Sequence, residues 1–431
     1  MACHIPKTKE KMPNIVLIMA DDMGVECLSC NGALSYSTPN LDRLAQHGIN
    51  FRMCFSQPLC TPSRVKIMTG KYNYRNYKDF AYLDVNEPTF GNMLKKAGYK
   101  TAVAGKWQLN GVKEWSNWEN MDRPVEFGFD EYCLWQLTYR GNRYPKPYME
   151  QNGEVLSTTM DDYGPDISCN YLLDFMERNH DVPFFAYYPM ILVHNPFRPT
   201  PDSPEWKDTS RRMDSDNRYF KDMVEYTDKI VGRIDEKLSE LGIRDNTLLI
   251  FLGDNGTNSA IITSTADGPY AGGKGNTTDA GIHVPMVVSW PAKINEGFET
   301  DYLVGFSDFF PTFADAAGIE KPENIDGKSF CPLLTGDDYM PRKTIFVHHD
   351  PKMKLWGIMR AGRFVRTNTH KLYHDGRFYN LEQDPLENHP LETGRLTEEE
   401  KIIYNDLKKE LDTAPEWVYV DENYKGDLKQ K

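Results

Sequence analysis

The chain has no long apolar run, few cysteines for its length and no excess of positive charge. Its longest apolar stretches, such as 15–20 and 247–252, are far shorter than the roughly 20 residues of a membrane-spanning helix. The formal net charge of −13 argues against a nucleic-acid partner, because phosphates would be repelled. Eight cysteines in 431 residues do not make a disulfide-dense framework. We therefore expect a soluble globular protein with neither a membrane span nor a nucleic-acid partner.

Two further absences concern zinc and targeting. Cys27 and Cys30 form one C-x-x-C pair without a second, whereas a structural zinc site needs four ligands. The chain opens M-A-C-H, without an apolar signal segment. This start fits either a cytoplasmic protein or a chain from which an export signal has been removed. We expect a periplasmic or extracellular protein, with the cytoplasm as the alternative.

Short apolar runs alternate with helical patterns over the first three-quarters of the chain. Such alternation is typical of an α/β sheet covered by helices on both faces. The predicted strands are 14–19, 100–104, 184–188, 247–252 and 283–290. The predicted helices are 38–45, 89–97, 168–178, 218–241 and 308–317.

The pattern changes after about residue 330. Short strands joined by turns are predicted at 345–347, 356–360, 363–367 and 377–379, and a charged helix at 397–411. We therefore predict a large α/β domain over residues 1–330. A smaller α+β subdomain, with an antiparallel sheet and a terminal helix, is predicted over residues 331–431.

Carboxylates follow two of the predicted strands. Asp21 and Asp22 end the first strand, and Asp254 and Asn255 follow the strand at 247–252. Ligands of doubly wound sheets bind at the carboxyl ends of strands. An all-oxygen set suits a hard cation such as Ca²⁺ or Mg²⁺ and not zinc. The alternative for each pair is ordinary turn chemistry, because Asp and Asn are common in loops.

The segment 60–64 is the strongest single motif. It reads C-T-P-S-R, and residues 68–71 continue with M-T-G-K. This pattern resembles the signature of type I, formylglycine-dependent sulfatases, which are arylsulfatase-like members of the alkaline-phosphatase superfamily. The alternative for a lone cysteine is a buried structural thiol. The surrounding motif favours a nucleophile precursor at Cys60.

Other segments resemble the motifs of that family in the expected order, over about residues 13–390. They are 14–24, 38–48, 105–109, His194 with 195–197, 253–256, 274–285, Asp308 with 311–312, and 379–385. Three departures stand out. Gln108 replaces a usual histidine, Asp279-Ala280 replaces Glu-Gly, and His283 replaces a usual arginine. They affect proton transfer and substrate contacts, not the class of reaction.

The resemblance implies an alkaline-phosphatase-like central sheet, mixed or parallel, between layers of helices, and a calcium site, with magnesium possible. Its metal ligands would be Asp21, Asp22, Asp254, Asn255 and residue 60. Its catalytic residues would be Cys60, Arg64, Lys106, Gln108, His194 and Lys274. A formylglycine-generating or anaerobic sulfatase-maturating enzyme would oxidise Cys60, and the aldehyde hydrate would attack sulfur.

The same resemblance assigns roles to the polar side chains. Arg64, Lys106 and Lys274 would neutralise the sulfate. His194 or Lys274 would protonate the leaving alkoxide. Gln108 can hydrogen-bond the formylglycine hydroxyl but cannot carry a proton.

The predicted substrate is a sulfated carbohydrate. Residues 132–148 are rich in rings and cations, namely Tyr132, Trp135, Tyr139, Arg140, Arg143, Tyr144 and Tyr148. These rings either contact sugar or pack a long loop against the core. Candidate substrate contacts are Trp135, Arg140, His283, His348 and His349. The alternatives are a phosphonate or phosphate ester hydrolase and a non-catalytic sugar-binding protein. The sequence defines neither the sugar nor the oligomeric state.

Overall fold

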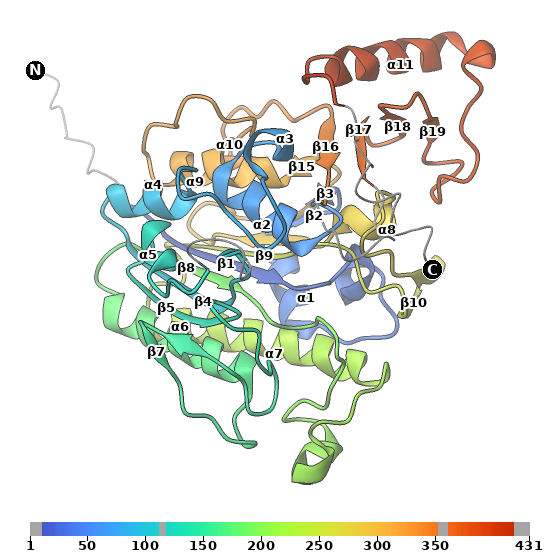
Figure 1. The fold of residues 1–431 in the computed structure, drawn as a ribbon. Coiled ribbons are helices and arrows are strands. Elements are labelled where there is room, and N and C mark those ends of the chain that lie inside the picture. Colours follow the sequence, from blue (N-terminus) through green and yellow to red (C-terminus); the bar gives the residue numbers. More distant parts are fainter. Residues whose placement is uncertain (1–10, 112–117, 352–360, 418–431) are drawn as a thin grey trace, which may run out of the picture.

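A ten-stranded sheet forms the centre of the molecule (Figure 1). The computed structural model describes residues 11–111, 118–351 and 361–417. Across the sheet the strands are β14 (Phe298–Thr300), β2 (Ile49–Phe51), β13 (Met286–Ser289), β9 (Thr247–Gly253), β1 (Asn14–Ala20), β8 (Phe184–Pro189), β4 (Lys100–Lys106), β5 (Glu131–Trp135), β6 (Glu150–Gln151) and β7 (Glu154–Val155). The five central strands β9, β1, β8, β4 and β5 run parallel, and antiparallel pairs flank them. The sheet is therefore mixed, which is one of the two arrangements predicted.

The position of β1 in the sheet explains why residues 15–20 are all apolar. Ile15, Leu17 and Met19 belong to one hydrophobic core, whereas Val16 and Ile18 belong to the core on the opposite face. Successive side chains of a strand point to opposite faces, so a strand between two helical layers must be apolar at every position.

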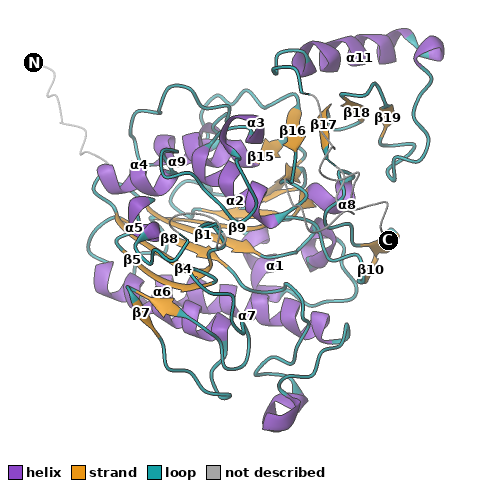
Figure 2. Ribbon diagram, viewed as in Figure 1, coloured by secondary structure: helices purple, strands orange, loops and turns teal. Residues whose placement is uncertain are grey.

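Helices cover both faces of the sheet (Figure 2). One layer contains α1 (Pro39–Gln46), α6 (Gly164–Asn179) and α7 (Tyr219–Glu240). The other contains α2 (Cys60–Thr69), α4 (Phe90–Lys96), α9 (Phe309–Ala316) and α10 (Cys331–Thr335). Short helices lie in the connections: α3 (Asn73–Asn76), α5 (Arg123–Glu126) and α8 (Asp279–Ile282). Within the described residues, no helix has the length and apolar character required to cross a bilayer.

The C-terminal region forms a second, antiparallel sheet with a terminal helix, as predicted. Its strands, in order, are β16 (Ile345–His349), β17 (Gly362–Arg366), β18 (His370–Tyr373) and β19 (Phe378–Asn380). Helix α11 (Glu398–Leu411) packs on one face of this sheet through Leu407 and Leu411. The division at residue 330 stays a prediction. Cys331 and Leu334 of α10, which follow that point, pack in the core of the large sheet.

Several details differ from the sequence prediction. The strand predicted at 283–290 is divided into β12 (His283–Val284) and β13, which belong to different sheets. Pro285 lies between them, and proline has no N–H to donate to a ladder. Strand β12 pairs with β3 (Cys54–Phe55), which also pairs with β15 (Val304–Gly305). Strand β18 was not predicted, and the strand predicted at 356–360 lies outside the described residues.

Candidate active site

The polar side chains after β1 and β9 meet at one edge of the sheet. The two strands are paired in parallel with Ala20 opposite Gly253, so the residues that follow are brought together. The backbone N–H of Asp22 donates to Oδ1 of Asp254 at 3.0 Å. Nδ2 of Asn255 donates to Oδ1 of Asp22 at 2.8 Å. Every one of these side chains is buried. The predicted juxtaposition of the two pairs is therefore present in the fold.

Helix α2 brings Cys60 to the same edge. Cys60 is the first residue of the helix, and all ten residues of the helix are buried. Its Sγ lies within 4.8 Å of carboxylate oxygens of Asp21 and Asp254. The thiol also donates to Oε1 of Gln108 at 3.1 Å. Gln108 follows β4 with φ of 56°, a left-handed conformation that costs a non-glycine residue about 1–2 kcal/mol.

Three cations are paired with the three carboxylates. Nζ of Lys106 lies 2.9 and 2.8 Å from the two oxygens of Asp21. Nη2 of Arg64 lies 3.0 Å from Oδ2 of Asp254, and Nη1 of Arg64 donates to the carbonyl of Lys106. The third pair joins Nζ of Lys274 to Oδ2 of Asp22 at 2.6 Å. Buried charges need such pairing, because the free-energy cost of removing an unpaired charge from water is large.

The pairing changes the acidity of the carboxyl groups unequally. Burial alone would raise the pKa of Asp21, but the positive charges around it, Lys106 first, lower it well below its usual range. The pKa of Asp22 is also lowered, since His194 and Lys274 outweigh its burial. Burial and the nearby charge of Asp21 raise the pKa of Asp254 to about 7. A divalent cation beside these oxygens would favour the charged form of Asp254 and so lower its pKa.

His194 lies beside Asp22 after β8. Its Nδ1 is 2.7 Å from the carbonyl oxygen of Asn195, and its Nε2 is 3.7 Å from Oδ2 of Asp22. Burial lowers the pKa of the imidazole to about 3, although Asp22 opposes this. A neutral ring that donates from Nδ1 to a carbonyl leaves Nε2 as a hydrogen-bond acceptor.

The residues at this edge fit a hard divalent cation. Asp21, Asp22 and Asp254 supply carboxylate oxygens close together. In two groups of three side chains, the ligand atoms all lie within 4.8 Å of one another: Asp21 with Asp22 and His194, and Asp21 with Cys60 and Asp254. Oδ1 of Asn255 is buried and accepts no hydrogen bond from the described residues. A buried acceptor without a donor is costly, and a coordinated cation would satisfy it.

A cavity of about 380 Å³ opens directly onto these groups. It brings together seven of the residues predicted from the sequence: Cys60, Lys106, Gln108, Trp135, Arg140, His194 and Lys274. Gln136 also lines it and was not predicted. Gln136 follows β5 with φ of 57°, and its carbonyl accepts from the N–H of Gln108. Strand β5 was not predicted from the sequence. Had it been, Gln136 would have been a candidate, because it follows the carboxyl end of β5 as Gln108 follows that of β4.

Three predicted substrate contacts are not among the described residues that line this cavity. His283 stacks on Phe55 at 4.9 Å, and its Nε2 lies 2.6 Å from the carbonyl oxygen of Arg52. His348 and His349 lie in β16, where both faces of the strand are buried; His348 accepts from Nε of Arg363 at 3.2 Å. Their roles in substrate binding remain predictions.

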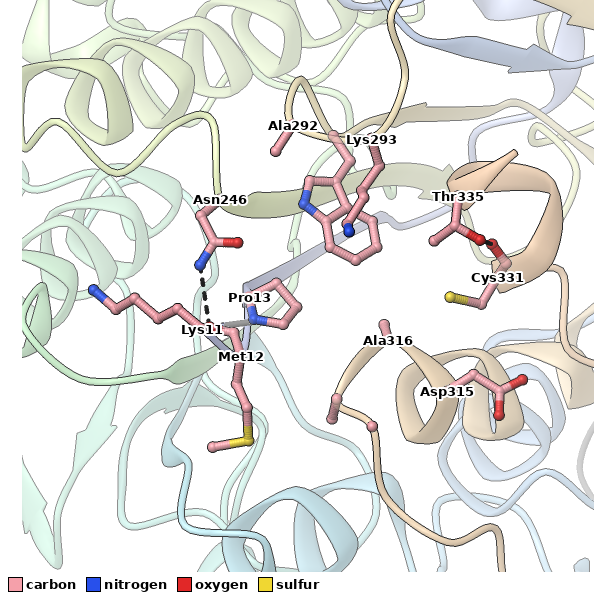
Figure 3. A pocket seen from close by; sticks show the side chains of 13 residues that line it. Lys11, Met12, Pro13, Asn246, Ala292, Lys293, Asp315, Ala316, Cys331 and Thr335 are labelled. Atoms are coloured by element: carbon pink, nitrogen blue, oxygen red, sulfur yellow. Dashed lines mark hydrogen bonds between the residues drawn. The ribbon is translucent and has the colours of Figure 1, made fainter. Parts of the chain in front are cut away.

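A second pocket, of about 430 Å³, lies at the opposite end of the strands (Figure 3). Its lining includes Met12, just before β1, and Asn246, just before β9. Nδ2 of Asn246 donates to the carbonyl of Met12 at 3.1 Å, the dashed line in Figure 3. Ligands of parallel sheets bind at the other, carboxyl, ends of strands. The cavity beside Cys60 is therefore the candidate active site.

Comparisons with known proteins agree with this geometry. The sulfatase family model matches residues 13–319, and a model of the C-terminal part of N-sulphoglucosamine sulphohydrolase matches residues 274–416. The chain is 30% identical to N-acetylgalactosamine-6-sulfatase of Mus musculus over 405 residues, 84% of this chain and 74% of that protein. It is 27% identical to steryl-sulfatase of Homo sapiens over 429 residues, 78% of this chain and 72% of that protein.

Solved structures extend the similarity to the fold. The crystal structure of Ps i-CgsB superimposes with a TM-score of 0.76 at 26% identity, and covers 94% of this chain and 92% of that one. The complex of the same protein with k-i-k-neocarrahexaose gives 0.74 at 25% identity, with 94% and 92% covered. The central sheet and the C-terminal sheet are thus both parts of a known architecture.

Proposed function

The chain belongs to the sulfatase family and is a sulfuric ester hydrolase, and on that premise we propose that Cys60 is its nucleophile precursor and a sulfated carbohydrate its substrate. The observation that carries the proposal is the position of Cys60. Its Sγ lies at the start of a buried helix, within 4.8 Å of two carboxylate groups that a metal could share. No other described cysteine lines the cavity.

A calcium ion, with magnesium as the alternative, is the proposed metal. Asp21, Asp22, Asp254, Asn255 and residue 60 would hold it. When bound, the ion would supply positive charge that stabilises an anionic nucleophile and fixes a sulfate oxygen. The carboxylate and amide oxygens favour this class of ion over zinc. The formylglycine made from Cys60 would supply the attacking oxygen.

In this proposal Lys106 and Lys274 bind and orient the sulfate, and Arg64 supports the site from behind. Lys106 and Lys274 both line the cavity and are already held in place by Asp21 and Asp22. An ammonium carries three N–H donors, so each lysine keeps donors for a sulfate oxygen after pairing with its carboxylate. Arg64 is almost fully buried behind the residues that line the cavity, and it holds Asp254 in place. Preorganised donors of this kind stabilise charge without reorganisation during the reaction.

We assign the proton for the leaving oxygen to Lys274. The pKa of Lys274 is raised, because the charge of Asp22 outweighs the effect of burial. The oxygen that leaves sulfur becomes an alkoxide unless it takes a proton, and Nζ of Lys274 is a donor at the wall of the cavity. Neutral His194 presents Nε2 as an acceptor, which suits it to orient the sugar hydroxyl or to receive a proton.

The carbohydrate part of the proposal is supported by the cavity and by relatives. The cavity is lined by amides and cations as well as rings, which fits a polar ligand. One relative is by its name an N-acetylgalactosamine-6-sulfatase, and a similar structure contains neocarrahexaose. A formylglycine-generating or anaerobic maturating enzyme is the proposed partner. A periplasmic or extracellular location, with the cytoplasm as the alternative, completes the proposal.

The decisive experiment measures sulfate release from a panel of sulfated mono- and oligosaccharides, an aryl sulfate and a matched aryl phosphate. The enzyme is co-produced with a formylglycine-generating enzyme, and peptide mass confirms the aldehyde at residue 60. We expect release from at least one sulfated sugar and its loss in the Cys60→Ala variant. Faster hydrolysis of the phosphate would instead support a phosphoryl hydrolase. If enzyme in which residue 60 is fully converted to the aldehyde hydrolyses none of these substrates, the result would support a non-catalytic sugar-binding protein.

A further inference from the structure

Arg143 is a buried cation of the active-site cavity that the proposed chemistry does not use. It lies in the connection between β5 and β6 and lines the same cavity as Cys60, with 7% of its surface exposed. Its Nη1 is buried and has no hydrogen-bond partner among the described residues. No carboxylate in the described part of the chain forms an ion pair with it. This differs from Arg64, Lys106 and Lys274, each of which has its own aspartate.

The guanidinium instead stacks on Trp135. Cζ of Arg143 lies 4.1 Å from the centroid of the indole ring. The ring is almost completely buried, so it supports Arg143 rather than offering a broad open face to a sugar. A stacked guanidinium keeps its in-plane N–H donors available, and this fork matches the oxygens of a carboxylate or sulfate.

The backbone around Arg143 is held firmly. Nε1 of Trp135 donates to the carbonyl of Gly141 at 3.0 Å. The hydroxyl of Tyr144 donates to the carbonyl of Ile191 at 3.1 Å, and also to that of His194. The hydrogen bond to the carbonyl of His194 links the connection between β5 and β6 to the residue that lies beside Asp22. Arg143 is therefore preorganised, which reduces the entropic cost of binding a ligand.

Burying an unpaired guanidinium is costly, and the cost is recovered when an anion fills the site. The scissile sulfate already has paired cations around Cys60. We propose that Arg143 binds a second oxyanion on the substrate, so that the enzyme prefers sugars carrying a further sulfate or a carboxylate. The inference rests on the proposed sulfatase function and specifies its substrate class.

The test compares kcat/KM of the matured enzyme for a singly sulfated monosaccharide, the same sugar with a second sulfate, and a disaccharide in which a uronic acid carries the second charge. We expect the parent enzyme to prefer one or both doubly anionic substrates, and the arm preferred identifies the group. Arg143→Gln should reduce this preference roughly 10- to 100-fold. Arg143→Lys should retain part of it, because the charge remains without the fork.

Arg212→Gln is the matched control. Arg212 is also buried and stacked on an indole, with Cζ 4.8 Å from the Trp206 centroid, but it donates to the carbonyls of Trp206 and Met160. Its variant should lower the melting temperature and leave the substrate preference unchanged. The inference is overturned if the parent shows no preference for a second anion. An equal loss on all three substrates in Arg143→Gln would also overturn it.

Binding measurements separate this inference from the proposed function. Calorimetric titration of the Cys60→Ala variant with the disulfated monosaccharide needs no turnover. Arg143-dependent binding supports the subsite even if no substrate is hydrolysed. If the matured enzyme releases sulfate but affinity for the disulfated and uronate sugars is independent of Arg143, the function stands and the inference fails.

Discussion

The guanidinium of Arg366, in the C-terminal sheet, lies 2.5 Å from the carboxylate of Asp279, in the segment that follows Lys274. Arg366 is almost fully buried, and Nζ of Lys371 in the next strand donates to the carbonyl of Thr277. The C-terminal sheet therefore holds the backbone that carries Lys274. Asp279, which departs from the family pattern, therefore has a buried partner in the C-terminal sheet.

Removing this ion pair should affect both stability and turnover. Asp279→Ala leaves Arg366 buried without its partner, so we expect a loss of about 3 kcal/mol in the free energy of unfolding. Because Lys274 is displaced, kcat should fall about tenfold. Asp375→Ala is the control, since Asp375 pairs with Arg377 at the surface. Denaturant titration and steady-state kinetics measure the two effects, and unchanged kcat would show that the sheet does not position Lys274.

Calcium should stabilise the folded protein through Asn255. An ion that binds only the folded state, and is present at a hundred times its dissociation constant, adds about 2.7 kcal/mol to the free energy of unfolding. We expect calcium to raise the melting temperature by a few degrees and a chelator to reverse this. Asn255→Ala should lose most of the calcium-dependent shift. Asn246→Ala, in the pocket at the other end of the sheet, should keep it; an equal shift in all three proteins would argue against Asn255 as a ligand.

Glu26 should make stability depend on pH. The carboxyl is 4% exposed, and burial raises its pKa from 4.5 to about 7. The unfolded chain loses this proton near pH 4.5, but the folded protein keeps it until about pH 7. The stabilisation is complete below pH 4.5 and is lost as the pH rises through 7, by about 3 kcal/mol in total.

Glu26→Gln tests this directly because glutamine resembles the protonated carboxyl. Denaturant titrations should give equal stability for the variant and the parent at pH 4.5, and a more stable variant at pH 8. Exposed Glu382, whose substitution by Gln should change neither value, is the control. A difference that does not vary between the two pH values would show that Glu26 is not protonated in the folded protein at neutral pH.

The cluster of acidic side chains at the candidate metal site could be predicted because its geometry follows from strand order. Asp21 and Asp254 each come directly after a fully apolar run, and parallel strands bring their carboxyl ends to one edge. The position of Cys60 could be predicted only from the motif around it. Its helix is buried on every side, so its sequence shows no amphipathic pattern that would indicate a helix.

The contacts formed by long connections could not be predicted in the same way. Arg143 and Gln136 reach the cavity through the fold of residues 136–149, which depends on tertiary hydrogen bonds such as that from Tyr144 to Ile191. His348 and His349 lie side by side in the sequence, but strand β16 buries both of its faces. No periodicity distinguishes a histidine in such a strand from one at a cavity wall.

Gln108 offers the sharpest test of how residue 60 is held. Its Oε1 accepts from the Cys60 thiol, and glutamine cannot titrate at any working pH. Gln108→Ala should lower kcat about tenfold with little change in KM, the loss expected for one hydrogen bond of about 1.4 kcal/mol. Alanine also has a Cβ, so it bears the same left-handed backbone strain and the comparison isolates the side-chain amide.

Gln108→His separates hydrogen bonding from proton transfer. An imidazole at this position titrates near pH 6.5, so the kcat profile should gain an inflection between about pH 6 and 7 that the parent enzyme lacks. Exposed Gln46, changed to Ala, serves as the control and should leave both kcat and the profile unchanged. If the parent already shows this inflection and Gln108→His does not alter it, the titrating group lies elsewhere. Gln108 would then only orient residue 60, and the departure from the usual histidine would carry no consequence for proton transfer.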